Sequence, residues 1–368
     1  MPLGKVQVNN LNLGQGDITA IERHFLFIGL AGHVDEESQL FSVGAQTDLT
    51  DVFADSNLRD QVIAAQLNAG QNWTAAVYPL AAAEDVFEAI DRANEVQSFE
   101  VIVLCDVQAS SPELTATHDY LTSLQATLGR FVSGLVAIPG IDKATQTWAQ
   151  YEAASVALQN GIAAHLVVPV PQLHGNNVGV LAGRLCDRSV SIADSPMRVA
   201  TGSVLGLGAA PTDSADAPLS LATLNTLSQA RLSVPQWYND FQGIYWGDAS
   251  TLDAAGGDYQ YLEHLRCVHK ASREVRVLAI RRVANRALNS TPNSIELNKT
   301  YFLKPLREMS KSTTILGTPF PGEIKPPIEG DVTIVWNSNK SVTIYLVVRP
   351  YNSPKEITVN ILLDLSSN

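Results

Sequence analysis

The chain of 368 residues has few cysteines, few charged side chains and no long apolar run. Its cysteines, Cys105, Cys186 and Cys267, form no CxxC pair, which excludes a disulfide framework and a cysteine zinc site. No run reaches the ~18 apolar residues of a membrane-spanning helix, and we expect no signal peptide, because the N-terminus lacks a basic start and an apolar core. Charged residues make up 17%, so we expect much of the surface to be covered, by the core or by neighbouring subunits.

The charge is unevenly distributed along the chain. The net charge is −12, which argues against a nucleic-acid-binding protein as a whole. Residues 259–368 hold 15 Lys and Arg against 9 Asp and Glu, a net charge of +6, and the residues before them carry −18. Such asymmetry is typical of a nucleic-acid contact, an acidic partner, or self-association through unlike faces.

Motifs for enzymatic chemistry are mostly missing. The patterns GxxxxGK[ST], HExxH and GxSxG are absent, and the near match to GxGxxG at residues 206–211 ends in proline and predicts a turn. We therefore expect no cofactor, no metal and no catalytic residue. One alternative stays open: an α/β enzyme with a small-molecule site near Asp106, Pro139 and Pro171, at the ends of three expected strands.

Residues 20–200 have the pattern of an acidic α/β domain. Short apolar runs that indicate buried strands alternate with segments that indicate helices, which predicts a mostly parallel sheet covered on both faces. The expected strands are 24–29, 75–80, 99–106, 132–139 and 164–170, and the expected helices are 55–69, 82–94, 111–128, 145–160 and 176–189.

The rest of the chain predicts a second, α+β domain over residues 259–349. Residues 201–258, rich in Gly, Ala, Ser and Pro, are expected to form an irregular connection. The 259–288 segment has apolar residues three or four apart and predicts the longest helix. A shorter helix over 296–309 and strands over 332–336, 341–349 and 357–363 follow.

The long helix carries a run of basic residues opposite its apolar face: Arg266, Lys270, Arg273, Arg281 and Arg282. A solvated helix face explains them as well as a protein interface does. A nucleic-acid site is the weaker alternative, because no aromatic residues are interleaved with them.

Both ends of the chain are prone to form strands and have no partner nearby in the sequence. An arm at residues 1–19 carries Val6, Val8, Leu11 and Leu13, and an arm at residues 350–368 carries Ile357, Val359, Ile361 and Leu363. Such a strand pairs with an exposed sheet edge, either of its own chain or of a neighbour.

Three segments together resemble the contractile tail sheath proteins of bacteriophages. The first is LHGNNVGVLAGRL at residues 173–185, a GxxxGR-type helix, followed by the loop SIADSP at residues 191–196. The second is the long helix with its pair Arg281 and Arg282, and the third is the closing strand ITVNILL at residues 357–363. The resemblance covers roughly residues 160–368 and the N-terminal arm.

This resemblance implies a structural protein of the virion tail that is assembled in the host cytoplasm. Sheath subunits form six-membered rings stacked into a helix around a tail tube, and their arms add strands to sheets of adjacent subunits. The basic third, with the five residues named above, would face the tube or a neighbour, and the acidic part would face outward. Contraction would drive the tube through the target cell envelope. The implied partners are other copies of the chain, the tube, the baseplate and the tail terminator, without direct contact to nucleic acid and without membrane insertion. A related machine, such as an R-type bacteriocin, is an alternative.

Overall fold

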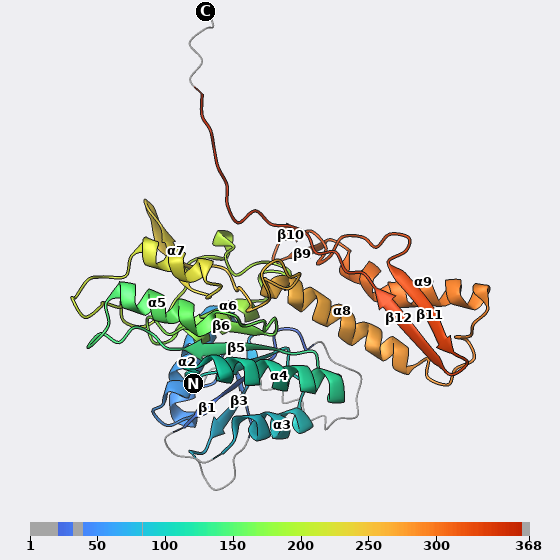
Figure 1. Cartoon of the computed structure of the whole chain (residues 1–368), viewed down its shortest axis with the longest axis horizontal. Helices are drawn as coiled ribbons and strands as arrows, with labels where there is room; N and C mark the ends of the chain where they lie inside the picture. Colours follow the sequence, from blue (N-terminus) through green and yellow to red (C-terminus); the bar gives the residue numbers. More distant parts are fainter. Residues whose placement is uncertain (1–20, 32–39, 83, 363–368) are drawn as a thin grey trace, which may run out of the picture.

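The computed structural model describes residues 21–31, 40–82 and 84–362. Within them the chain forms a large α/β body and a smaller C-terminal unit, which are connected by one long helix (Figure 1). The predicted fold class, an α/β sheet domain followed by a domain with a long helix and strands, is confirmed. The Val6, Val8, Leu11 and Leu13 positions of the predicted N-terminal arm, and Leu363 of the C-terminal arm, lie outside the described residues.

The body is built on a six-stranded sheet in the order β2-β3-β1-β4-β5-β6. All neighbouring strands are parallel except β2, which is antiparallel to β3. The central strands are nearly all buried, as expected for a parallel sheet covered on both faces. The bounds are β1 (Phe25–Leu30), β2 (Phe41–Gly44), β3 (Thr74–Leu80), β4 (Val101–Leu104), β5 (Ser133–Ile138) and β6 (Val167–Pro171).

Helices cover both faces of this sheet (Figure 1). Helix α2 packs on β1 and against α6. Helices α3 and α4 form the right-handed crossover connections that lead to β4 and β5, and they lie on the opposite face of the sheet. Their ends follow from local chemistry: Ser110 and Glu113 form a capping box at the start of α4, and Gly129 ends it in the left-handed conformation. The bounds are α1 (Leu49–Val52), α2 (Asn57–Ala69), α3 (Val86–Val96), α4 (Ser111–Leu128), α5 (Trp148–Gln159) and α6 (Asn177–Cys186).

Residues 201–258 differ from the predicted irregular connection. They contain helix α7 (Leu221–Gln229) and a hairpin of β7 (Pro235–Tyr238) and β8 (Phe241–Trp246), after the short 3-10 helix η1 (Val199–Thr201). Trp246 is fully buried in the core of the body, and its indole nitrogen donates a hydrogen bond to Ser233 Oγ at 2.9 Å. The prediction was wrong because the Gly, Pro and Ser residues punctuate short elements here and do not mark a linker.

Helix α8 (Leu262–Ile280) connects the two parts of the molecule (Figure 1). Its first turn places Leu262 and Leu265 in the core of the body. Further along, Cys267 and Ala271 belong to a second apolar cluster, and Val275 belongs to a third, inside the C-terminal unit. The helix is shorter than the predicted 259–288, because turns replace it after residue 280.

The C-terminal unit packs a hairpin on two helices. Helix α9 (Pro292–Met309) lies against α8 and against strand β11, and its Phe302 is buried in their common cluster. The inner face of the hairpin contributes Val332 and Ile334 to the same cluster. The strands are β9 (Thr313–Ile315), β10 (Thr318–Phe320), β11 (Val332–Ser338) and β12 (Ser341–Leu346).

Candidate assembly surfaces

The described part of the C-terminal arm is an exposed, extended segment that leaves the molecule (Figure 1). No strand is assigned to residues 351–362, and the predicted strand over 357–363 has no partner among the described residues. The side chains of Ile357, Val359 and Ile361 are 74%, 74% and 89% exposed. Apolar residues at this level of exposure are unfavourable in water, so this segment is suited to pairing with another surface.

The β11–β12 hairpin offers a surface of matching chemistry. Its two strands pair with each other, and no other described strand adds to their sheet. The outer face carries Val335 and Tyr345, which are exposed. A two-stranded sheet has two outer edges with unpaired backbone groups, which can template pairing with a further strand.

The basic residues of α8 do not form one free surface. Arg266 is buried and binds Glu100 through two hydrogen bonds, Nε to Oε1 at 2.7 Å and Nη2 to Oε2 at 3.0 Å. Arg273 is also buried and donates to the backbone carbonyl of Phe131 and to Glu22. For Arg266 and Arg273 the prediction of a face toward the tube or a neighbour is therefore wrong: their charges are neutralised within the chain.

The other three predicted basic residues lie nearer the surface. Lys270 is paired with both carboxylate oxygens of Glu323 at 2.7 Å. Arg281 is exposed, and the guanidinium of Arg282 lies 4.0 Å from the centre of the Tyr301 ring. Arg281 and Arg282 stay candidates for contact with a partner.

The Glu100–Arg266 pair stabilises the joint between the body and α8. Burial alone would raise the pKa of Glu100, but the charge of Arg266 and its hydrogen bonds hold that pKa below its ordinary value. The Arg23 backbone N–H also donates to Glu100. A buried pair that is satisfied in this way holds α8 in one orientation on the sheet, because separating the two charges would leave both unpaired.

The GxxxGR motif of the sequence performs two structural tasks on α6. A Cβ atom at Gly179 or Gly183 would lie only 2.1 Å from the Gln61 carbonyl oxygen or 2.2 Å from that of Ala65, so the glycines permit close packing of α6 on α2. The motif's last residue, Arg184, is buried and donates to three backbone carbonyls of the following loop, those of Pro196, Arg198 and Gly202, at 2.7, 2.8 and 2.9 Å. The sequence pattern alone did not point to Gln61, whose side chain binds the start of α6.

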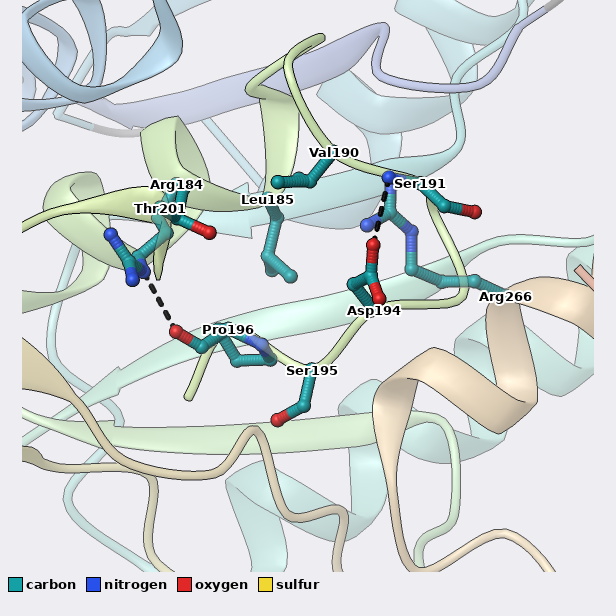
Figure 2. Close-up of a pocket in the computed structure, with 9 residues that line it drawn as sticks. All are labelled: Arg184, Leu185, Val190, Ser191, Asp194, Ser195, Pro196, Thr201 and Arg266. Atoms are coloured by element: carbon teal, nitrogen blue, oxygen red, sulfur yellow. Dashed lines mark hydrogen bonds between the residues drawn. The ribbon is translucent and has the colours of Figure 1, made fainter. Parts of the chain in front are cut away.

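A small cavity lies beside this loop, where it faces α8. Figure 2 shows Arg184, Asp194 and Arg266 around it, and Asp194 accepts a hydrogen bond from the backbone of Ser191 at 3.0 Å. The cavity has room for about one water molecule. The full lining is Arg184, Leu185, Val190, Ser191, Asp194, Ser195, Pro196, Thr201 and Arg266.

The residues of the enzyme alternative are engaged in structural bonds. Asp106 follows β4 and accepts a hydrogen bond from the backbone N–H of Leu30 at 2.7 Å, and burial raises its pKa. The carbonyl of Pro139 accepts from the Tyr151 hydroxyl at 2.8 Å, and Pro171 pairs in register with Ile138. These contacts close the ends of the strands without assembling a set of groups for acid–base or nucleophilic chemistry.

Within residues 21–31, 40–82 and 84–362, no three His, Cys, Asp or Glu side chains are grouped so that they could hold a metal ion. In the same part of the chain, no helix is both long and apolar enough to cross a membrane. The three thiols are buried, and burial raises the pKa of each.

Comparison with known proteins adds independent evidence. Two family models match the chain, the DUF2586 N-terminal domain over residues 3–250 and the DUF2586 C-terminal domain over residues 258–366. A protein of Haemophilus phage HP1 (strain HP1c1) with the name "Putative tail sheath protein" is 46% identical over an alignment of 373 positions that covers 98% of each chain.

Solved structures share the fold at low sequence identity. The helical sheath of the anti-feeding prophage in its contracted state matches with a TM-score of 0.58 and 12% identity, covering 98% of this chain and 99% of that one. A sheath tail protein from Listeria innocua matches with a TM-score of 0.56 and 12% identity, over 91% and 93% of the two chains. One from Desulfitobacterium hafniense matches with 0.55 and 12%, over 94% and 96%. The chain therefore belongs to the DUF2586 family and, through its close relative, to the tail sheath proteins of contractile phage tails.

Proposed function

We propose that the chain polymerises as stacked hexameric rings around a tail tube, and that the polymer shortens to drive the tube through a target cell envelope. The observation that carries this proposal is the exposed apolar segment at residues 356–362, which leaves the molecule at the body, while the β11–β12 hairpin at the other end of α8 has unpaired edges. An exposed apolar segment without a partner among the described residues, together with an open sheet edge, favours head-to-tail joining of identical subunits.

The distribution of charge over the molecule supports one orientation of the subunit in such a polymer. Arg281 and Arg282 lie at the far end of α8 from the acidic body, which supports an inner surface formed by the C-terminal unit and an outer surface formed by the body. The inner surface would contact the tube protein. The two ends of the polymer would contact a baseplate and a tail terminator, and assembly would occur in the host cytoplasm.

Shortening requires no bond chemistry in this proposal. The extended polymer would be a kinetically trapped state, and release at the baseplate would let subunits rotate as rigid bodies into larger contacts. The two arms would keep neighbouring subunits connected during that rotation. The likeness to a sheath from an anti-feeding prophage keeps a related injection machine, such as an R-type bacteriocin, as the alternative particle type.

Truncation tests the role of the arms. A chain that ends at Lys355 loses the exposed segment but retains the contacts of Lys355 with the body. We expect this variant, and a variant without residues 1–16, to remain folded monomers by circular dichroism and sedimentation, whereas the full chain forms hollow cylinders in negative-stain electron microscopy. Normal cylinders from either truncated protein would overturn the proposed role of the arm that it lacks.

A matched pair of substitutions tests strand pairing without changing the length of the arm. Val359→Pro removes a backbone N–H from the middle of the segment, and Val359→Thr keeps both the N–H and the β-branched shape. If the segment adds a strand to a neighbour, the proline variant assembles poorly and the threonine variant assembles like the parent. Equal assembly of both would contradict strand addition.

A further inference from the structure

Two buried carboxylates lie where the C-terminal arm leaves the body. Asp248 and Glu263 are both buried, although Asp248 lies after strand β8 and Glu263 lies in the first turn of α8. The ammonium of Lys355 lies between them, 2.5 Å from Asp248 Oδ2 and 2.8 Å from Glu263 Oε1. It also lies 3.2 Å from the centre of the Tyr261 ring.

The arrangement of these carboxylates suits one cation. The second oxygen of Asp248 accepts a hydrogen bond from Ser195 Oγ at 3.1 Å, so this carboxylate is held in place from the opposite side. Oε2 of Glu263 is buried, and no other described residue donates a hydrogen bond to it. Burial and the negative charge of Asp248 raise the pKa of Glu263. Two buried carboxylates repel each other, and an ammonium between them offsets both that repulsion and the loss of hydration.

The chain changes character directly after this contact. The side chain of Lys355 is 23% exposed, whereas the next apolar side chain, Ile357, is 74% exposed. Before Lys355, the chain is held by the ion pair of Arg349 with Asp331 and by a bridge of Pro350 to Ile324. Lys355 is therefore the last described residue of the arm that an ion pair ties to the molecule.

We propose that Asp248, Glu263 and the ring of Tyr261 form a binding socket for the ammonium group of Lys355, which anchors the root of the arm so that its free part begins at Glu356. The ligand class is a primary ammonium on an extended peptide. This inference goes beyond polymerisation, since it concerns the single subunit before any contact with a neighbour.

The rate of tryptic cleavage after Lys355 reports whether the socket holds the lysine side chain. Lys355 is the last Lys or Arg of the chain, and Arg349 is followed by proline, so Lys355–Glu356 is the one tryptic bond within residues 350–368. Trypsin must take the lysine side chain into its own specificity pocket, which it cannot do while the socket holds that side chain. Release of the peptide 356–368 from the monomeric protein, followed by intact mass, therefore measures opening of the socket.

The reference is a synthetic peptide with the sequence of residues 350–362, cut under the same conditions. We expect the monomer to be cut at Lys355 at least about tenfold more slowly than the peptide, because cleavage must wait for release of a charge-assisted contact. Thermolysin, which cuts before Ile361 and Leu362, should cut the arm quickly in the same sample. Cleavage at Lys355 within about twofold of the peptide rate would overturn the proposal.

Variants of the socket sharpen the test. Glu263→Gln and Asp248→Asn each keep the shape of the side chain and remove one charge, and either should speed cleavage at Lys355 without changing the thermolysin rate. Glu329→Gln is the matched control, because this exposed carboxylate has no described contact with Lys355. Because two socket variants are made, the test remains valid if one of them fails to fold. Protection that persists in both would show that another feature shields the bond and would overturn the socket. Failure of the full chain to polymerise would refute the proposed function and leave this result unaffected.

Discussion

Arg266 on α8 and Glu100 before β4 are 166 positions apart in the chain, yet they form a buried ion pair with two hydrogen bonds. Each residue is the main neutralising partner of the other. The pair lies where the body meets α8, so we expect its removal to affect the orientation of the C-terminal unit and not a local element alone.

Removal of one partner is expected to be severe. Glu100→Gln leaves Arg266 as a buried, unpaired charge, and Arg266→Met leaves Glu100 in the same condition, so each should lower the free energy of unfolding by about 3–5 kcal/mol. The double variant should be milder than the sum of the two by about 2 kcal/mol, since no charge is then left alone. Urea denaturation of the four proteins measures this coupling, and additive effects would contradict it.

Stability is expected to fall at mildly acidic pH because of His269. Burial, and then the charge of Arg273, lower the pKa of His269 to about 3. The unfolded chain therefore binds a proton near pH 6.5 that the folded chain does not accept until about pH 3, so stability decreases as the pH falls through this window. Between pH 7 and pH 5 the parent should lose about 2 kcal/mol more than His269→Gln.

Denaturation curves at the two pH values measure this difference. The other histidines are the same in both proteins, and their contributions cancel. An equal loss in parent and variant would mean that His269 is protonated while folded.

The close crossing of α6 on α2 predicts intolerance of the smallest enlargement. Gly183→Ala would place a methyl group 2.2 Å from the Ala65 carbonyl oxygen, so the helices must separate. The expected loss is about 1–3 kcal/mol, although alanine favours a helix more than glycine does. Thermal unfolding followed by circular dichroism measures the change, and a stabilised variant would mean that the two helices can move apart freely.

The clamp made by Arg184 requires the planar guanidinium. Arg184→Lys retains the charge but cannot reach the carbonyls of Pro196, Arg198 and Gly202 at once. Hydrogen exchange should therefore speed up in the 196–204 loop. Arg188→Lys is the matched control, because Arg188 donates one hydrogen bond from its Nε atom, to the carbonyl of Asn72, at an exposed position. Unchanged exchange in the Arg184 variant would refute the clamp.

The body could be predicted well from the sequence, because a buried parallel strand has a recognisable sequence pattern, a short apolar run. Val101–Leu104 and Ser133–Ile138 lie within the expected segments for this reason. Strand β2 was not predicted, since four residues at a sheet edge carry too little pattern. The hairpin of β7 and β8 was not predicted either, because the turn residues around it suggested an irregular segment.

The basic residues of α8 could be assigned to a helix from the sequence, but their role could not be predicted. Spacing along the chain puts Arg266 and Arg273 opposite the apolar stripe, which usually means solvent. Glu100 and Glu22, the residues that neutralise them, come from distant parts of the chain. The role of these arginines therefore depends on tertiary pairing, which a helical pattern does not contain.

The course of α8 through three apolar clusters also gives the molecule a lever. Its 19 residues form a rod of about 28 Å, with one end clamped in the sheet domain and the other bearing the hairpin. A tilt of about 10° at the clamped end would sweep the far end through roughly 5 Å, a step comparable to the spacing between paired strands. In the proposed polymer, torque applied to the body would be converted by this rod into displacement of the edge where subunits are linked.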